Sequence, residues 1–145
     1  MSDAELLLPE LVEETAPFWS ACERGELVVQ RCDSCGRLRF PPRPACPWCQ
    51  SFEFSWPAVS GRGTVWSFVV AHPPLLPAYA ELAPYNVIVV ALDEDPTIRL
   101  VGNLVASADA AIDSVDPATI EIGMPVAVVF QRVADDVVLP RWMRA

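Results

Sequence analysis

Residues 32–49 have the sequence CDSCGRLRFPPRPACPWC, in which two Cys-x-x-Cys pairs are separated by ten residues. Each pair can turn two thiolates toward a common point, and four thiolates there match the tetrahedral coordination of Zn2+ in structural sites. Gly36 after the first pair permits the necessary backbone bend, whereas Gln50 takes the equivalent place after the second pair. The segment therefore predicts one structural Zn2+ in a small ribbon, with the ligands Cys32, Cys35, Cys46 and Cys49. Because four thiolates leave no open position for water, the metal is not expected to be catalytic.

Disulfide bonds are the alternative use of these cysteines. The first residues, MSDAELLLPELVEE, lack the basic start and the apolar run of a signal peptide. Elsewhere the apolar runs are short, well below the roughly 18 residues of a membrane span. A cytoplasmic location is therefore expected, and stable disulfide bonds are uncommon in that reducing compartment. The remaining cysteine, Cys22, falls on an apolar helix face and is expected in the core.

A short helix is expected before the ribbon. Thr15 could cap it, Pro17 is tolerated in its first turn, and Gly25 is placed to end it after Glu23 or Arg24. A helix of this length is too short to be stable alone, so it must dock on another part of the chain.

Strand patterns make up most of the rest of the chain. Short strands are expected at 27–31 and 37–40, with a linker around 51–60. Longer β-rich segments follow at 60–72, 85–94, 97–106, 122–133 and 136–142. Five strands with one long connection between the third and the fourth match a Greek-key barrel of the OB type, and a β-sandwich fragment is the alternative. The fold class is therefore expected to be mainly β: a short N-terminal helical segment, a zinc ribbon and a C-terminal five-stranded OB-fold barrel.

The charge is negative overall but unevenly distributed. The net charge is −9 and the isoelectric point is near 4.4, which disfavours nucleic acid and anionic lipid over most of the surface. Residues 24–43 nevertheless hold five arginines against two acidic residues, and the chain contains no lysine. Guanidinium groups suit binding of carboxylate and phosphate, although a solvated charged hairpin would explain the same residues.

Aromatic residues accompany this basic segment. Phe18, Trp19, Trp48 and Trp66 form a large aromatic set for so short a chain, and core packing must absorb some of them. If Trp19 and Trp48 stay partly exposed, they could flank an apolar ligand beside the arginines. The residues alone therefore suggest a ligand with an apolar chain and a phosphorylated head.

No catalytic signature is found. His72 is the only histidine, and a lone histidine is more often structural than catalytic. The nucleophile-elbow, P-loop, dinucleotide-binding and zinc-protease motifs do not occur. Independent catalysis is therefore not expected, and no catalytic residue is assigned.

Several segments together resemble a known family. The segment APFWSACERGELVVQRCDSCGRLRFPPRPACPWC is followed by SGRGTVWSFVVAH, PYNVIVVALDE, LVGNLV, IGMPVAVVF and VVLPRW. In this order they resemble the zinc-ribbon plus OB-fold proteins associated with acyl-CoA metabolism, known as domain of unknown function thirty-five. The resemblance implies an N-terminal helical segment (1–29), a rubredoxin-like zinc ribbon (30–58) and an OB-fold domain (59–145).

The resemblance also implies a function. Members of this family accompany thiolase-fold enzymes, either thiolases or aldolases of steroid side-chain degradation, as non-catalytic scaffold subunits that bind acyl-CoA. Coenzyme A is thought to contact the helical segment and the ribbon, and the matching residues here are Phe18, Trp19, Arg39 and Arg43. Two alternatives stay open at this point. Zinc ribbons and OB folds also bind single-stranded nucleic acid, which the net charge disfavours, and a self-sufficient enzyme could use His72 as a base.

Overall fold

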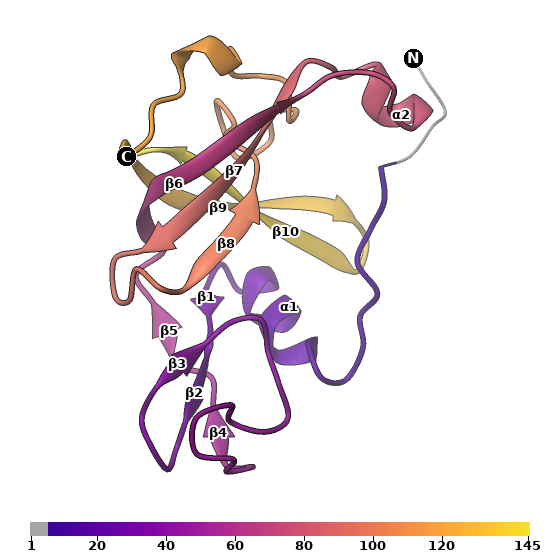
Figure 1. The fold of residues 1–145 in the computed structure, drawn as a ribbon. Helices are drawn as coiled ribbons and strands as arrows, with labels where there is room; N and C mark the ends of the chain where they lie inside the picture. The colour runs from indigo at the N-terminus through magenta and orange to yellow at the C-terminus, as the bar shows by residue number, and fades with distance from the viewer. Residues whose placement is uncertain (1–5) are drawn as a thin grey trace.

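A computed structural model describes residues 6–145, so the first five residues of the expected N-terminal segment lie outside it. The chain forms a small ribbon and a larger barrel, with one helix between them (Figure 1). The ribbon region contains α1 (Ala16–Glu23), β1 (Leu27–Val28), β2 (Gln30–Cys32), β3 (Leu38–Arg39), β4 (Phe54–Ser55) and β5 (Ala58–Val59). The barrel region contains β6 (Arg62–Ala71), α2 (Pro77–Ala80), β7 (Tyr85–Leu92), β8 (Arg99–Gly102), η1 (Pro117–Thr119), β9 (Pro125–Ala134) and β10 (Val137–Arg144).

Helix α1 forms where the sequence predicts it. Pro17 lies in its first turn, and Gly25 follows it with a φ of +74°, a conformation that glycine adopts without steric cost. The Thr15 side chain does not cap the helix, contrary to expectation. Its hydroxyl donates to the carbonyl of Val12 and accepts from Nε1 of Trp19, at 3.3 and 3.2 Å. The helix buries Phe18 and Cys22 against β9 and β10, which confirms that it docks on the barrel.

The ribbon consists of very short antiparallel strands. β2 lies between β3 and β4, and β1 pairs separately with β5. The expected strand at 27–31 is therefore divided, because β1 pairs with β5 while β2 turns to its own neighbours. The expectation of a plain linker at 51–60 is wrong, since β4 and β5 both lie within it. Paired segments of two residues are too short to show a hydrophobic alternation in the sequence.

Five antiparallel strands form the barrel in the order β10-β9-β6-β7-β8. The expected pairing of β7 with β8 across the turn at 93–96 is confirmed. A parallel bridge between Leu104 and Trp142 brings the end of β8 to β10, and the Trp142 N–H donates to the Asn103 carbonyl at 3.0 Å. This contact nearly closes the sheet, so the OB-type barrel is confirmed and the sandwich alternative is wrong.

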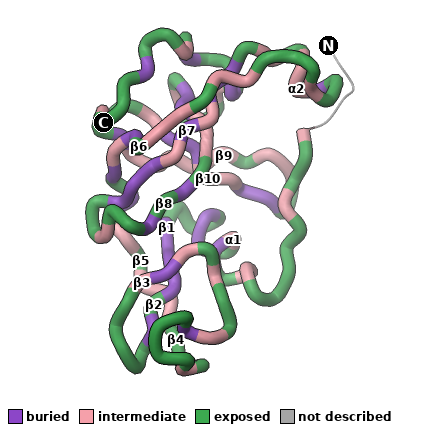
Figure 2. The backbone as a smooth tube through the Cα atoms, viewed as in Figure 1, coloured by how far each residue is buried: buried purple, intermediate pink, exposed green. Residues whose placement is uncertain are grey.

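The main hydrophobic core lies inside the barrel and continues into α1 and β1. Figure 2 shows buried residues concentrated in these elements, whereas the far end of the ribbon is exposed. Trp142, Ile88, Leu104 and Val126 are each at most 1% exposed. Asn86 is a buried polar residue whose side chain donates to the carbonyl and accepts from the N–H of Leu104, at 2.9 and 2.7 Å. These bonds fix the segment after β8 against β7.

No helix within residues 6–145 is long and apolar enough to cross a membrane.

Candidate metal centre and apolar cavity

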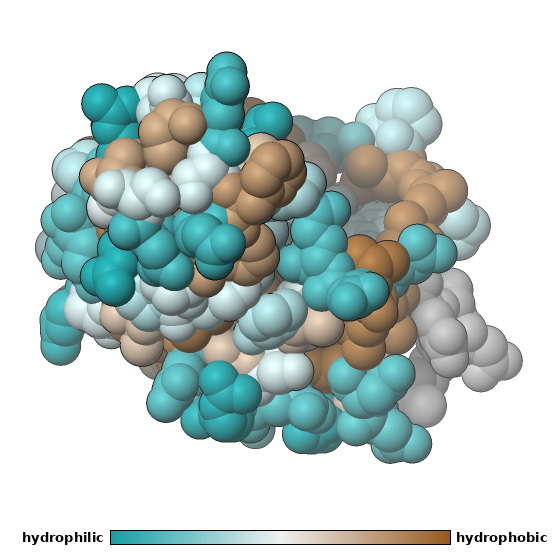
Figure 3. Space-filling model, turned by 90° about the horizontal axis from the view of Figure 1, so that it is seen from below, coloured by the Kyte–Doolittle hydropathy of each residue, from teal (hydrophilic) through white to brown (hydrophobic). Residues whose placement is uncertain are grey.

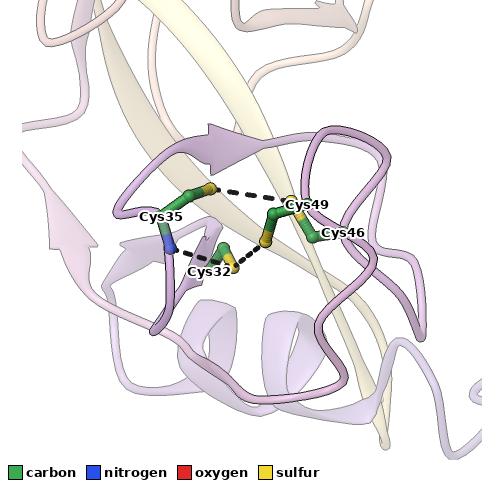
Figure 4. Close-up of side chains that lie close together, drawn as sticks. All are labelled: Cys32, Cys35, Cys46 and Cys49. Atoms are coloured by element: carbon green, nitrogen blue, oxygen red, sulfur yellow. Dashed lines mark hydrogen bonds between the residues drawn. The ribbon is translucent and has the colours of Figure 1, made fainter.

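The four predicted cysteine ligands converge on one point of the ribbon (Figure 4). Their sulfur atoms all lie within 4.8 Å of one another. The Sγ atoms of Cys32 and Cys49 are 3.5 Å apart, and those of Cys35 and Cys46 are 3.7 Å apart. These separations exclude disulfide bonds, whose sulfur atoms are about 2.05 Å apart. Thiolates around a tetrahedral zinc ion lie about 3.8 Å apart, given Zn–S bonds of about 2.3 Å, so the spacing fits a four-thiolate metal site.

The two cysteine pairs have matching backbone turns. The Gly36 N–H donates to the Cys32 carbonyl and the Gln50 N–H donates to the Cys46 carbonyl, both at 2.8 Å. Gly36 has a φ of +76° and Gln50 a φ of +64°, so both residues after the pairs are left-handed. Gln50 therefore takes the same conformation as the glycine, at a steric cost that glycine avoids.

The electrostatics of the cluster favour a bound cation. The Cys35 N–H donates to the Cys32 sulfur and lowers the pKa of that thiol. Burial raises the pKa of Cys46, but the N–H groups of Cys49 and Trp48 outweigh it and bring the pKa to about 6. The Ser51 N–H lowers the pKa of Cys49, yet the three neighbouring sulfurs raise it to about 11. Crowded thiolates repel one another, and a divalent cation among them removes that repulsion.

A buried polar network supports the loop that carries the second cysteine pair. Arg39 is 3% exposed, and its Nε donates to Oε1 of Gln30 at 2.8 Å. Its Nη2 donates to the Arg43 carbonyl at 2.9 Å, and the Arg43 N–H donates to the same Gln30 oxygen at 2.8 Å. The guanidinium also lies over the Phe54 ring, 5.4 Å from its centre. Arg39 therefore faces the protein interior, whereas Arg43 is exposed.

An apolar cavity of about 490 Å3 opens between α1, the loop after β3 and the barrel. The structure places Phe18 and Trp19 in its wall, as two of the predicted ligand-binding residues, but neither Arg39 nor Arg43 lines it. The other residues that define this cavity were not predicted from the sequence; they are chiefly Phe40, Tyr79, Tyr85 and Arg141. The motif FPP at 40–42 can be recognised in the sequence. No local sequence pattern indicates Arg141, which lies far along the chain from this motif.

The other aromatic and histidine candidates lie elsewhere on the surface. Trp48 is 53% exposed, and the guanidinium of Arg37 lies 5.1 Å from its ring centre. Trp66 is 50% exposed, and the guanidinium of Arg99 lies 3.9 Å from its ring centre. His72 is exposed just after β6. Trp48 and Trp66 do not line the apolar cavity, whereas Trp19 does.

Exposed apolar residues also occur on the surface. Seen from below, the surface is mostly polar, with brown hydrophobic residues at the upper left and a further hydrophobic group on the right (Figure 3). The segment before α1 contributes four large exposed side chains, Leu7, Leu8, Leu11 and Val12.

Family models match both halves of the chain. Residues 19–55 match the model described as "ChsH2, rubredoxin-like zinc ribbon domain", and residues 56–131 match "ChsH2, C-terminal OB-fold domain".

Curated relatives differ in length. The 3-oxo-4,17-pregnadiene-20-carboxyl-CoA hydratase alpha subunit of Mycobacterium tuberculosis is 37% identical over 83% of this chain and 35% of its own length. A probable enoyl-CoA hydratase alpha subunit of Thermomonospora curvata is 39% identical over 91% of this chain and 38% of its own length. This chain therefore spans little more than a third of these two relatives. A DUF35 domain-containing scaffold protein of Methanocaldococcus jannaschii is 34% identical over 79% of this chain and 74% of its own length.

Solved structures share the fold. A chain of the "Ltp2-ChsH2(DUF35) aldolase" superposes with a TM-score of 0.80 and 37% identity, over 94% of this chain and 98% of that one. A DUF35 protein of unknown function from Sulfolobus solfataricus superposes with a TM-score of 0.57 over 92% of this chain and 86% of that one. Its identity of 11% shows a shared fold alone.

Proposed function

The chain belongs to the DUF35 family of zinc-ribbon and OB-fold proteins that includes ChsH2, and on this premise we propose that it is a non-catalytic scaffold subunit of a thiolase-type enzyme. The observation that carries the proposal is the superposition on a chain of the Ltp2-ChsH2 aldolase, which covers nearly the whole of both chains. A partner of this kind, a thiolase or a steroid side-chain aldolase, would supply the catalytic residues.

Two features of the molecule support the scaffold role. The cysteine cluster uses four thiolates, which leaves a bound Zn2+ no open position for a substrate. We therefore propose Zn2+ as a structural ion that stabilises the ribbon (30–58) between the helical segment (1–29) and the OB-fold domain (59–145). The exposed apolar side chains before α1 offer a surface that a partner could cover.

The first experiment is recovery of the partner from the native host. A tagged chain, purified from a nuclease-treated lysate, should co-purify a thiolase-fold enzyme in near-stoichiometric amount, identified by mass spectrometry. A variant with Leu7 and Leu11 both changed to serine should recover less of that enzyme, because the change removes exposed apolar contacts without touching the core. Recovery of ribosomal or replication proteins alone would favour the nucleic-acid alternative, and recovery of neither class would refute the thiolase partner.

We further propose that the chain binds acyl-CoA along the edge between α1 and the ribbon. Phe18 and Trp19 line the apolar cavity and would contact the acyl part, while the exposed Arg43 is available to the phosphates. Arg39 would act through Arg43, because its Nη2 holds the Arg43 carbonyl and its guanidinium is enclosed. In this arrangement Arg39 positions the loop that carries Arg43, and Arg43 contacts the ligand.

Arg43→Ala is expected to weaken binding of acyl-CoA by roughly tenfold, the loss of one charge-assisted hydrogen bond to phosphate. Isothermal titration calorimetry with decanoyl-CoA would measure the change. Arg24→Ala is the matched control, because Arg24 is also exposed in the basic segment and pairs only with Glu26, at 3.7 Å. Equal affinities for the Arg43→Ala, Arg24→Ala and unaltered chains would contradict the assignment of Arg43.

A further inference from the structure

Arg141 is a buried cation without an acidic partner. It lies on β10, and its side chain is largely enclosed, with 8% of the residue exposed. Its Nε donates to Oε1 of Gln131 at 3.1 Å and its Nη1 donates to Oδ1 of Asn103 at 2.9 Å. Both acceptors are neutral amides. Within residues 6–145, the only ion pairs are Arg24 with Glu26 and Arg132 with Glu23.

The third nitrogen of this guanidinium has no hydrogen-bond partner in the described part of the chain. Asp109 lines the adjoining cavity together with Arg141, but its carboxylate accepts from the Ser107 hydroxyl at 2.9 Å. Burial removes water from the Arg141 guanidinium and lowers its pKa, although arginine stays charged at any physiological pH. A buried cation of this kind gains most from a nearby anion.

Tyr79 on α2 supplies a second donor beside it. Its phenol oxygen accepts from the Leu7 N–H at 3.0 Å, which leaves the phenolic O–H available to donate. Within the described residues no acceptor for this O–H is present. Tyr79 and Arg141 line the same cavity, so an anion between them would receive an O–H and a guanidinium N–H.

The space around these two donors is large enough for a small molecule and is mostly apolar on the side of Phe18 and Trp19, whereas Asp109 and Gln131 add polar groups on the other side. Tyr79 and Arg141 line both the cavity of about 490 Å3 and an adjoining one of about 680 Å3, which also touches Leu6, Leu7, Leu8 and Phe130. The two donors therefore lie where the cavities meet. Pockets of a few hundred Å3 with mostly apolar walls and a few polar groups are typical of small-molecule sites.

We propose that this paired cavity binds an apolar molecule that ends in a carboxylate, with the carboxylate held by Arg141 and Tyr79 and the apolar part packed against Phe18, Trp19 and Phe40. Arg141 is the cation that lines both cavities, whereas Arg132, which lines only the second, pairs with Glu23 at 3.4 Å. One carboxylate would balance the charge of Arg141, and a phosphate dianion would leave an unbalanced negative charge. Its apolar wall includes Phe18 and Trp19, which were proposed above to contact the acyl part of acyl-CoA, so the two proposals share one cavity. Ligands that lack coenzyme A test the carboxylate site separately from the acyl-CoA proposal.

A charge series of ligands tests the proposal. Calorimetry on the complete chain would compare decanoate with decanol and with decyltrimethylammonium, the two ions below their micelle concentrations and decanol below its solubility limit. Decanoate should bind at least about tenfold more tightly than decanol, the gain expected of a charge-assisted hydrogen bond in an apolar site, and the cation should bind most weakly. Equal binding of decanoate and decanol, or no binding of decanoate, would overturn it.

Two variants assign the effect to the two donors. Arg141→Gln should abolish the preference for decanoate over decanol, and Tyr79→Phe should reduce it several-fold by removal of one hydroxyl. Tyr79→Phe keeps the test decisive if Arg141→Gln fails to fold, because the phenyl ring preserves the packing. Arg99→Gln is the control, since Arg99 lies over Trp66 outside both cavities and should leave the preference intact. An unchanged preference for decanoate over decanol in Tyr79→Phe would contradict the binding of the carboxylate by Tyr79 and Arg141.

Discussion

Removal of the metal is expected to unfold residues 30–50 and to loosen α1, while the barrel strands persist. The ribbon strands are only two or three residues long, and its far end is exposed, so the cysteine cluster and the buried Arg39–Gln30 contact are its main supports. Structural Zn2+ contributes about 10–16 kcal/mol of apparent binding free energy in such small units, which is also folding free energy. α1 should respond because the Phe18 and Phe40 rings lie 5.5 Å apart across the boundary. Chelation followed by far-UV circular dichroism and tryptophan fluorescence would measure both changes.

Single cysteine variants test whether the cysteine cluster binds the metal. Cys46→Ser should reduce the metal content from one ion per chain to nearly none, because Cys46 is a buried member of the cluster. Cys22→Ala is the control: this thiol is buried in the core, where burial raises its pKa to about 12, and it takes no part in the cluster. It should keep a full complement of metal. Unchanged spectra after verified metal loss would show that the ribbon is held by its own packing.

The sequence predicted the metal centre and the barrel well because their signals are local. Four cysteines in two short pairs must converge if each pair forms a tight turn, and the structure confirms that convergence. The barrel strands are long enough for β-branched runs to stand out, and short turns indicate the pairing of β7 with β8 and of β9 with β10. The pairing of β6 with β9 has no such local signal, because these strands are far apart in the chain. By contrast, β4 and β5 are two residues long and become strands only through pairing with distant partners, so no local pattern marks them.

The candidate ligand residues were harder to predict, because charge in a sequence does not indicate burial. The family resemblance and the basic segment both point to Arg39, yet this residue pairs with Gln30 across β2 and β3 and faces inward. That pairing could have been suspected from Gln30, a polar residue that follows three apolar ones. No sequence pattern indicates the burial of Arg141, because its hydrogen-bond partners Gln131 and Asn103 come close to it only in the folded barrel.

Trp142→Ala is expected to lower the free energy of unfolding by about 3–5 kcal/mol, the cost of a large cavity in a packed core. Trp142 is 1% exposed, and its backbone forms the bonds with Asn103 and Val105 that bring β10 to the end of β8. Its indole packs directly on Gly102, where an added Cβ would lie 2.8 Å from the ring. The variant should therefore weaken the contact that closes the barrel and also leave a cavity in the core. Thermal unfolding should shift down by roughly 10 °C or more for a chain of this size.

Trp66→Ala is the matched control, because it removes the same side chain from an exposed position on β6. Half of Trp66 is already in contact with water, and its main partner is the Arg99 guanidinium over its ring, 3.9 Å from the centre. A cation–π contact at such a site is worth about 0.5–1 kcal/mol, so its loss should cost several-fold less than the loss of Trp142. Equal losses from both variants in urea titrations would contradict the view that barrel closure depends on Trp142. A larger loss of unfolding free energy in Trp142→Ala would instead indicate that stability depends on the closure of the barrel. The same closure brings Asn103 and Arg141 together at the edge of the cavity.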